Sequence, residues 1–270
     1  SLEGFDGRSE PFTDLIHLIR PHKGQIETAA NIRYLLQDSK LAAGSKTVVQ
    51  DPYSFRCVPQ VHGASKDSIN YVKGVLEIEM NSVTDNPNIF LSEDKIISGG
   101  NFHGQPLAMA IDYCSIAASE LGNISDRRCY LMLEGKYGLP RLLTEKGGLN
   151  SGFMIPQYTT AALVTENKSL CFPASADSIP TSLGQEDHVS MGSISGRKFN
   201  QILGNLEKIL AIELMYAAQA LEFRGGIKCS ALIQENYQLL RNQVLKLEED
   251  RLLKEDIQTL IKMIQNQTFI

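Results

Sequence analysis

The strongest constraint on the fold is a long apolar segment, roughly residues 189–223, in a part of the chain that contains no proline after Pro180. Its apolar side chains recur at the three-, four- and seven-residue intervals of an α-helix. They are Phe199, Ile202, Leu203, Leu206, Ile209, Leu210 and Leu214, with Ala211, Ile212, Met215 and Ala217 on the other sides. A helix that is apolar on several sides must be surrounded by other helices. The predicted fold class is therefore all-α, with long antiparallel helices in one bundle.

Shorter patterns predict the remaining elements. Helical periodicity indicates two helices within 11–38 and single helices near 65–83, 106–135, 156–170, 231–247 and 253–265. Residues 41–60, 135–153 and 171–185 are expected to be loops, because proline, glycine or polar residues are frequent there. The segments 89–91 and 95–98, separated by Ser92-Glu93-Asp94, predict a short β-hairpin. We expect one helical region over 1–270, and helices this apolar predict assembly into a homo-oligomer.

Composition argues against several classes of function. The 270 residues carry a net charge of −5 with a pI near 5.6, so neither nucleic acid nor an anionic membrane is an expected partner. The five cysteines form no CxxC pair, which is typical of reduced thiols in a cytoplasmic protein. The five histidines lack the spacing of a metal site, and no apolar run reaches membrane-spanning length. The chain starts at Ser1 without a signal peptide or an initiating Met, so we expect it to open in mid-protein.

A polar motif occupies residues 50–57, which read Gln-Asp-Pro-Tyr-Ser-Phe-Arg-Cys. Gln50, Tyr53 and Arg56 are three positions apart, so a helical or turn-like path places them on one side. Arg56 has the planar fork of donors that matches a carboxylate, and Tyr53 and Gln50 can orient a polar small molecule. The alternative is a polar loop that caps the next helix.

Four further blocks follow this motif: Pro59-Gln60-Val61-His62-Gly63, Asn81-Ser82-Val83-Thr84-Asp85-Asn86-Pro87, Ser98-Gly99-Gly100-Asn101-Phe102-His103-Gly104-Gln105-Pro106 and Gln185-Glu186-Asp187-His188-Val189-Ser190-Met191. In this order the five blocks resemble the C-terminal part of the histidine ammonia-lyases and cover most of the chain. The resemblance implies deamination of L-histidine to trans-urocanate and ammonia, in a homotetramer whose sites are shared between chains.

The same resemblance implies a cofactor that this chain does not form. The family uses a methylidene-imidazolone electrophile made from an Ala-Ser-Gly tripeptide in its N-terminal half. The sequence contains no Ala-Ser-Gly. We therefore expect the isolated chain to be inactive and its sites to be completed by the absent half.

Roles for single residues follow from the resemblance. It implies that Arg56 clamps the substrate carboxylate, that Tyr53 is the proton-transferring phenol and that Gln50 orients substrate or electrophile. Phe102 matches the aromatic ring packed on the electrophile. Glu186 matches a catalytic carboxylate that faces the substrate imidazole, and Met154 matches a pocket residue of the histidine branch. Glu186 and Met154 therefore favour histidine as the substrate.

Other interpretations remain open for these residues and for the whole chain. Phe102 also suits an ordinary core position, and Glu186 suits a carboxylate before a helix N-terminus. Met at the start of a helix commonly serves packing alone. The alternative functions are a tyrosine or phenylalanine ammonia-lyase or aminomutase of the same fold, or a helical scaffold without chemistry of its own.

Overall fold

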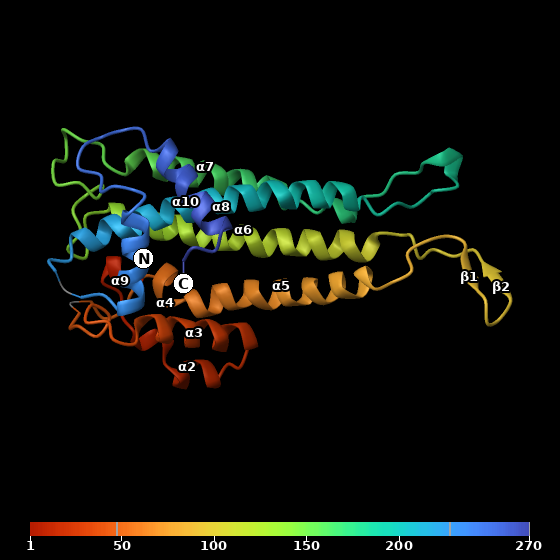
Figure 1. Cartoon of the computed structure of the whole chain (residues 1–270), viewed down its shortest axis with the longest axis horizontal. Helices are drawn as coiled ribbons and strands as arrows, with labels where there is room; N and C mark the ends of the chain where they lie inside the picture. The colour runs from red at the N-terminus through yellow and green to blue at the C-terminus, as the bar shows by residue number, and fades with distance from the viewer. Residues whose placement is uncertain (47, 227, 270) are drawn as a thin grey trace.

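Four long helices form an elongated antiparallel bundle in the computed structural model, which describes residues 1–46, 48–226 and 228–269 (Figure 1). They are α5 (Val58–Met80), α6 (Gln105–Leu133), α7 (Met154–Leu170) and α8 (Gly192–Glu222). Helix α6 packs against α5, α7 and α8, and α7 also packs against α8. The predicted all-α bundle is confirmed.

The shorter helices gather at one end of this bundle, which we call the proximal end (Figure 1). It contains the starts of α5 and α7 and the ends of α6 and α8. The elements around it are α1 (Leu2–Phe5), α2 (Asp14–Leu18), α3 (Lys23–Leu36), α4 (Tyr53–Arg56), α9 (Ala231–Arg241) and α10 (Lys254–Gln265). Helix α3 lies directly on α5, and a Cβ atom on Gly63 would come within 2.4 Å of the Gln25 amide nitrogen. Glycine therefore permits the close contact between these two helices.

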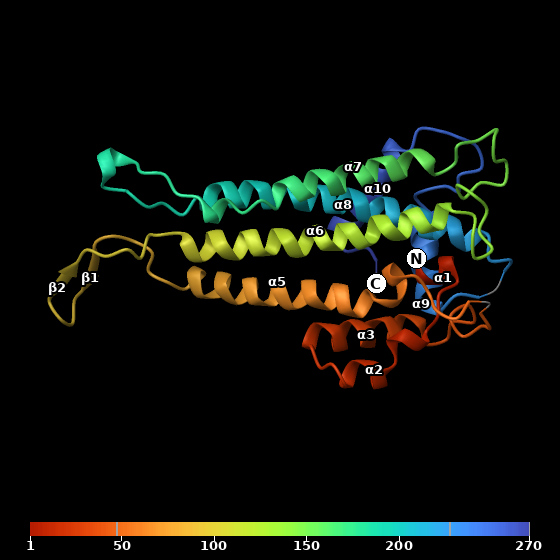
Figure 2. The ribbon, with the colours of Figure 1, turned by 180° about the vertical axis from the view of Figure 1, so that it is seen from behind.

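Two loops extend past the opposite end of the bundle, the distal end (Figure 2). One holds the hairpin of β1 (Asn88–Phe90) and β2 (Lys95–Ile97), which are antiparallel with Asn88 opposite Ile97. The predicted hairpin is confirmed. The other loop spans residues 171–191 between α7 and α8, with two short 3₁₀ helices, Ala174–Ala176 and Ser182–Gly184.

Three predicted boundaries were wrong. The segment 41–60 is not a continuous loop, because α4 starts at Tyr53 and α5 starts at Val58 rather than near 65. The prediction treated Pro52 and Pro59 as loop residues. Pro52 instead precedes α4, and Pro59 lies in the first turn of α5, where a helix needs no amide donor. The helix predicted to end near 247 ends at Arg241, and the first N-terminal helix is limited to five residues after a 3₁₀ turn at Glu10–Phe12.

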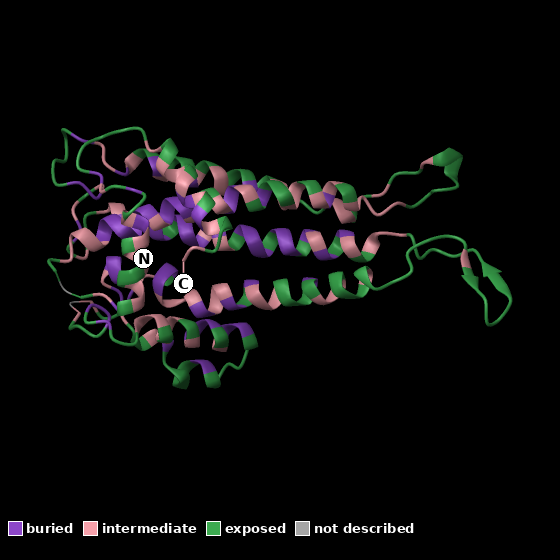
Figure 3. Cartoon of the chain, in the orientation of Figure 1, coloured by how far each residue is buried: buried purple, intermediate pink, exposed green. Residues whose placement is uncertain are grey.

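The apolar core is concentrated at the proximal end (Figure 3). Tyr216, Phe5 and Phe55 are among its largest buried side chains, and the Phe5 and Phe55 rings stack with centroids 4.0 Å apart. Towards the distal end, the described residues form two small buried clusters, around Val72 and around Ile202. Within the described residues, no helix is long and apolar enough to cross a membrane.

Candidate active site

Tyr53 and Arg56 lie on one side of the short helix α4, as their spacing predicts. The Arg56 guanidinium carbon is 4.4 Å from the centre of the Tyr53 ring, which is a cation–π contact. The Tyr53 side chain is 71% exposed and lies on the surface of this chain. Gln50 precedes α4 and is also exposed. The α4 segment therefore presents a phenol and a guanidinium together.

Neighbouring residues hold this motif from behind. Asp51 is buried, and its carboxylate accepts the backbone N–H of Arg8 at 2.6 Å. Phe55 is buried against Phe5, which turns the opposite side of α4 into the core. The Ser54 carbonyl accepts a hydrogen bond from Arg128 at 3.3 Å. The polar face of α4 is thus fixed by burial of its other face.

A buried ion pair supports α4 from α6 and α8. Arg128 donates from Nε and Nη2 to the two carboxylate oxygens of Glu213, at 2.5 and 2.8 Å, and Ser125 donates to the same carboxylate at 2.6 Å. Burial alone would raise the pKa of Glu213, but the Arg128 charge and its hydrogen bonds outweigh burial and lower that pKa to about 2. Glu213 is therefore ionised, and Arg128 joins it to the Ser54 carbonyl of α4.

His62, one helical turn into α5, is close to this pair. Burial, reinforced by the positive charge of Arg128, lowers the pKa of His62 to about 4. Its Nε2 atom is buried without a hydrogen-bond partner in the described part of the chain. His62 is consequently a neutral imidazole at physiological pH and lies behind α4.

A cleft of about 430 Å³ opens beside Tyr53, between α4, α5, α6 and α7. Along α6 it is lined by Glu120, Asn123, Ile124 and Arg127. Sequence reasoning did not single out these four positions. Their spacing of three, one and three residues is the signal that could have found them, because it places them on one face of a helix. Arg127 adds a second guanidinium near Tyr53, although it also pairs with the carboxylate of Asp126.

Phe102 and Glu186 lie at the distal end. Phe102 is 57% exposed and sits just before α6. Glu186 is exposed in the loop between α7 and α8, where its carboxylate accepts a hydrogen bond from the Thr181 hydroxyl at 2.6 Å. The backbones of Thr181 and Glu186 also pair, with the Thr181 N–H donating to the Glu186 carbonyl at 2.8 Å. Glu186 therefore has a defined position at the tip of this loop.

Met154 is the first residue of α7, at the proximal end. It lines a cavity of about 710 Å³ together with Tyr130, Glu134, Arg141 and Gln157. This cavity and the cleft beside Tyr53 share no lining residue. Met154 is therefore near the end of the bundle that holds Tyr53, in a separate depression.

One chain does not bring these six residues together. Tyr53 and Arg56 precede the first residue of α5. Helix α6 runs antiparallel to α5, and its register is given by the hydrogen bonds from Ser65 to Ala117 and from Ser68 to Tyr113. In this register Phe102, just before α6, lies level with the last residue of α5. Helix α5 has 23 residues and is about 34 Å long. The pair Phe102 and Glu186 therefore lies about one α5 length from the pair Tyr53 and Arg56.

Comparison with known proteins places the chain in a family. Residues 1–242 match the model of the family described as aromatic amino acid lyase. The chain belongs to that family. A histidine ammonia-lyase of Caldanaerobacter subterraneus subsp. tengcongensis is 51% identical over 268 residues, covering 98% of this chain and 53% of that protein. The chain thus spans about half the length of the curated relatives it matches.

Solved structures of aromatic amino acid lyases show the same fold. A histidine ammonia-lyase from Trypanosoma cruzi superposes with a TM-score of 0.91 at 42% identity, covering 99% of this chain and 51% of that one. A tyrosine aminomutase from Streptomyces globisporus superposes with a TM-score of 0.94 at 37% identity, covering 99% and 55%. The fold is therefore shared by lyases and aminomutases and does not by itself separate their reactions.

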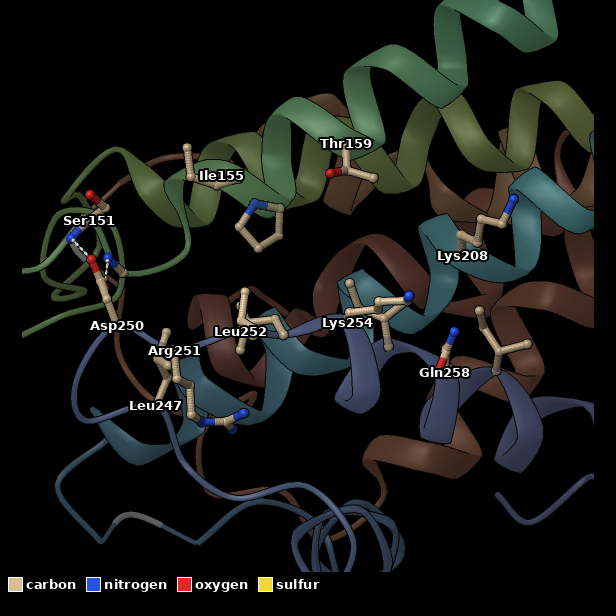
Figure 4. A pocket seen from close by; sticks show the side chains of 15 residues that line it. Ser151, Ile155, Thr159, Lys208, Leu247, Asp250, Arg251, Leu252, Lys254 and Gln258 are labelled. Atoms are coloured by element: carbon tan, nitrogen blue, oxygen red, sulfur yellow. Dashed lines mark hydrogen bonds between the residues drawn. The ribbon is translucent and has the colours of Figure 1, made fainter.

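A further cavity of about 480 Å³ lies between α7, α8 and the segment 247–261 (Figure 4). Asp250 closes one end, where its carboxylate accepts the backbone N–H groups of Ser151 and Gly152 at 2.7 and 2.8 Å. Lys208 and Gln258 lie at the opposite end. None of the six predicted site residues lines this cavity, and part of its wall follows residue 242, where the match to the aromatic amino acid lyase family ends.

Proposed function

We propose that this chain forms part of a histidine ammonia-lyase, which converts L-histidine to trans-urocanate and ammonia. The observation that carries the proposal is the 51% identity to a histidine ammonia-lyase over nearly the whole chain. The residues matched to the family's site are all present, and Glu186 at the distal end favours histidine over other aromatic amino acids.

Arg56 and Tyr53 bind and deprotonate the substrate in this proposal. Arg56 donates from its planar fork to the substrate carboxylate, which pairs the negative charge and fixes the orientation of the amino acid. Its contact with the Tyr53 ring, 4.4 Å from guanidinium carbon to ring centre, places the phenol next to the bound carboxylate. The Tyr53 hydroxyl then acts as the general base that removes a proton from substrate carbon or nitrogen.

The distal residues serve the other end of the substrate. Glu186 accepts a hydrogen bond from the imidazole N–H, and Thr181 holds its carboxylate in place. Phe102 presents an exposed ring for packing against the electrophile and the substrate. From the proximal end, Gln50 orients substrate or electrophile by hydrogen bonds, and Met154 lines the pocket around the imidazole.

The electrophile must come from outside this sequence, which has no Ala-Ser-Gly. A methylidene-imidazolone supplies an electron-poor carbon that activates the amino acid for loss of ammonia. The side chains present suit such a group: Phe102 and Tyr53 are exposed aromatic rings, and Gln50 is an exposed amide. The isolated chain accordingly binds no amino acid tightly and turns over nothing.

A homo-oligomer joins the two ends, and we propose a tetramer in the cytoplasm. The supporting feature is a set of exposed apolar side chains on the distal halves of α5 and α6, including Ile69, Leu76, Met80, Met109 and Ile116. Exposed apolar surface of this extent is typical of protein interfaces. Antiparallel packing of two bundles places the proximal end of one chain beside the distal end of the next. The five cysteines are free thiols, in agreement with a cytoplasmic protein.

The test is reconstitution with a separately expressed partner polypeptide that contains the Ala-Ser-Gly half of a related lyase. We expect urocanate absorbance to rise with wild-type chain. Turnover should fall at least about 100-fold with Tyr53→Phe or Glu186→Gln, and KM should rise with Arg56→Ala. Tyr34→Phe, which removes another exposed phenol from α3, is the matched control and should leave turnover unchanged.

The main competing function is an aminomutase, because a tyrosine aminomutase superposes as well as a histidine ammonia-lyase does. Reconstituted protein should therefore be assayed on tyrosine and phenylalanine in parallel. A β-amino acid product, or turnover of these two substrates alone, would replace the proposal. A well-formed complex that turns over none of the three would favour a helical scaffold.

A further inference from the structure

The two distal loops contact each other through a pair of histidines. His103 follows Phe102 in the loop before α6, and His188 lies two residues after Glu186 in the loop before α8. The ring centres of the two histidines are 5.6 Å apart with the planes tilted by 42°. The His103 Nε2 atom is also 3.2 Å from the His188 carbonyl oxygen. Two segments that are 85 residues apart in sequence are thus joined next to the candidate site residues.

The hydrogen bonds of His103 identify its tautomer. The Nδ1 atom lies 3.3 Å from the backbone N–H of Gln105, the first residue of α6, and so acts as an acceptor. Nε2 must then carry the proton, and it donates to the His188 carbonyl. His103 therefore links the first turn of α6 to the loop that carries Glu186.

Other contacts secure the base of this loop but do not reach its tip. Gln105 Nε2 donates to the Ser175 carbonyl at 3.1 Å, and the Ser175 N–H donates to the buried carboxylate of Asp112 at 2.7 Å. A Cβ atom on Gly104 would lie 3.1 Å from Ser190 Oγ, so the two segments pass closely there. Among these contacts, the hydrogen bond from His103 to His188 lies nearest in sequence to the candidate site residues. His103 directly follows Phe102, and His188 is two positions after Glu186.

We propose that His103 is a positioning residue that fixes the spacing between Phe102 and Glu186. The catalytic part of this inference rests on the proposed function, in which Glu186 contacts the substrate imidazole and Phe102 packs on the electrophile. His103 itself does not touch the substrate. It acts through the carbonyl of His188, because a loop held at this point keeps the Glu186 carboxylate at a constant distance from the Phe102 ring.

Three variants separate the parts of the contact. His103→Gln keeps an N–H donor near the position of Nε2 and so retains the bond to the His188 carbonyl. His103→Asn keeps an acceptor near Nδ1 for the Gln105 N–H but is too short to reach that carbonyl. His188→Ala is the matched control, because it removes the second ring and leaves the carbonyl unchanged.

The first measurement is amide hydrogen exchange on the present chain alone. The reporter is the Val189 N–H, which donates to Ser178 Oγ at 2.9 Å across the loop. We expect His103→Asn to speed its exchange about fivefold, the effect of one net hydrogen bond, with His103→Gln and His188→Ala within twofold of wild type. Equal exchange in all four proteins would overturn the proposal.

The second measurement is kinetics of the reconstituted lyase. His103→Asn should raise the KM for L-histidine about fivefold, because Glu186 no longer meets the imidazole, and His103→Gln should restore it. The inhibition constant of L-alanine, which has the amino and carboxylate groups but no imidazole, should stay unchanged. A loss of folded sites alone would change neither the KM for L-histidine nor the inhibition constant of L-alanine. An unchanged KM in His103→Asn would overturn the positioning role. Faster exchange in His103→Asn together with an inactive wild-type assembly would instead disprove the proposed lyase function and leave the contact between the loops established.

Discussion

The proximal and distal ends of the bundle are built in different ways from the same four helices. At the proximal end the helices surround buried aromatic residues, including Tyr216, Phe5 and Phe55, and a buried ion pair joins Arg128 to Glu213. At the distal end the same helices expose Leu76, Met80 and other apolar side chains, and their loops extend beyond the bundle (Figure 3). The contrast teaches that the proximal end supplies its own core, whereas the distal end leaves apolar side chains exposed, which is the basis of the proposed homo-oligomer.

The candidate site residues follow this division. Tyr53 and Arg56 are mounted on a helix whose other face is fixed in the core by Phe55. Phe102 and Glu186 are mounted on loops that are held by a few exposed hydrogen bonds. We therefore expect substitutions of buried residues at the proximal end to lower the stability of the whole chain. Substitutions at the distal end should act on local order and on assembly.

The largest effect is expected from breaking the buried ion pair. Arg128→Ala leaves the Glu213 carboxylate buried without its partner, which should lower the free energy of unfolding by about 4 kcal/mol. The control is Arg127→Ala at the preceding residue, whose side chain is 61% exposed. Its partner Asp126 keeps a 2.6 Å hydrogen bond from Thr160. It should cost less than about 1 kcal/mol. Urea unfolding measures both, and equal losses would refute the contrast between a pair whose two partners are buried and a pair whose cation is exposed.

A core substitution should have the next largest effect. Ile212→Ala removes a fully buried side chain of α8 at the proximal end and should cost about 3 kcal/mol. The same change at Ile96 in the distal hairpin, which is 71% exposed, should cost less than about 0.5 kcal/mol. Thermal or urea unfolding compares the two variants. A large loss at Ile96 would show that the hairpin is part of the stabilising core.

The pH dependence of stability should come in part from His62. The unfolded chain takes up a proton at this residue near pH 6.5, but the folded protein does so only near the lowered pKa of about 4. Stability should therefore fall as pH drops from 6.5 to 4, by about 3 kcal/mol from this residue. His62→Gln should remove that part of the slope in urea unfolding at a series of pH values. An unchanged slope in the variant would show that His62 is accessible to protons in the folded state.

Glu213 should act in a lower pH range. Its pKa is about 2 in the folded protein against an ordinary value of 4.5, so its stabilising effect is complete above pH 4.5 and is lost as pH falls towards 2. In Arg128→Met this acid-dependent loss should shrink, because the carboxylate loses the cation that lowers its pKa most. Acid titration followed by circular dichroism measures the difference, and the same acid midpoint in both proteins would contradict it.

A smaller loss of global stability than that of Ile212→Ala is expected at the base of the distal loop. Asp112→Ala removes the buried carboxylate that accepts the Ser175 N–H, and should lower the free energy of unfolding by about 1 kcal/mol. Amide exchange at Ser175 should rise at the same time, because this loop depends on few contacts. Asp112→Asn, which keeps an oxygen acceptor, is the control. Faster exchange at the proximal end as well would show that the two regions are coupled.

The sequence predicted much of the helical architecture because helices leave a local signal. The periodicity from Phe199 to Leu214 located α8, and the short apolar segments on either side of Ser92-Glu93-Asp94 located the hairpin. The start of α5 was missed because Pro52 and Pro59 were taken as loop residues, although proline is tolerated in a first helical turn. Local rules therefore predicted the interiors of helices better than their first turns.

The candidate site was predicted in parts. The three-residue spacing of Tyr53 and Arg56 predicted that they share one side, and the contact between ring and guanidinium agrees. The cleft residues Asn123 and Arg127 were not predicted, because their relation to Tyr53 depends on how α4 and α6 pack. The catalytic roles of all six residues stay predictions.

From the sequence alone came the helices, the hairpin and the polar motif, because each depends on residues that are close together in the chain. Tertiary structure alone decided that Arg128 and Glu213 pair in the core, that His103 meets His188, and that Phe102 and Glu186 lie far from Tyr53 and Arg56. The physical reason is that burial and long-range contacts depend on helix packing. Helix packing brings together residues whose separation in sequence carries no periodic signal.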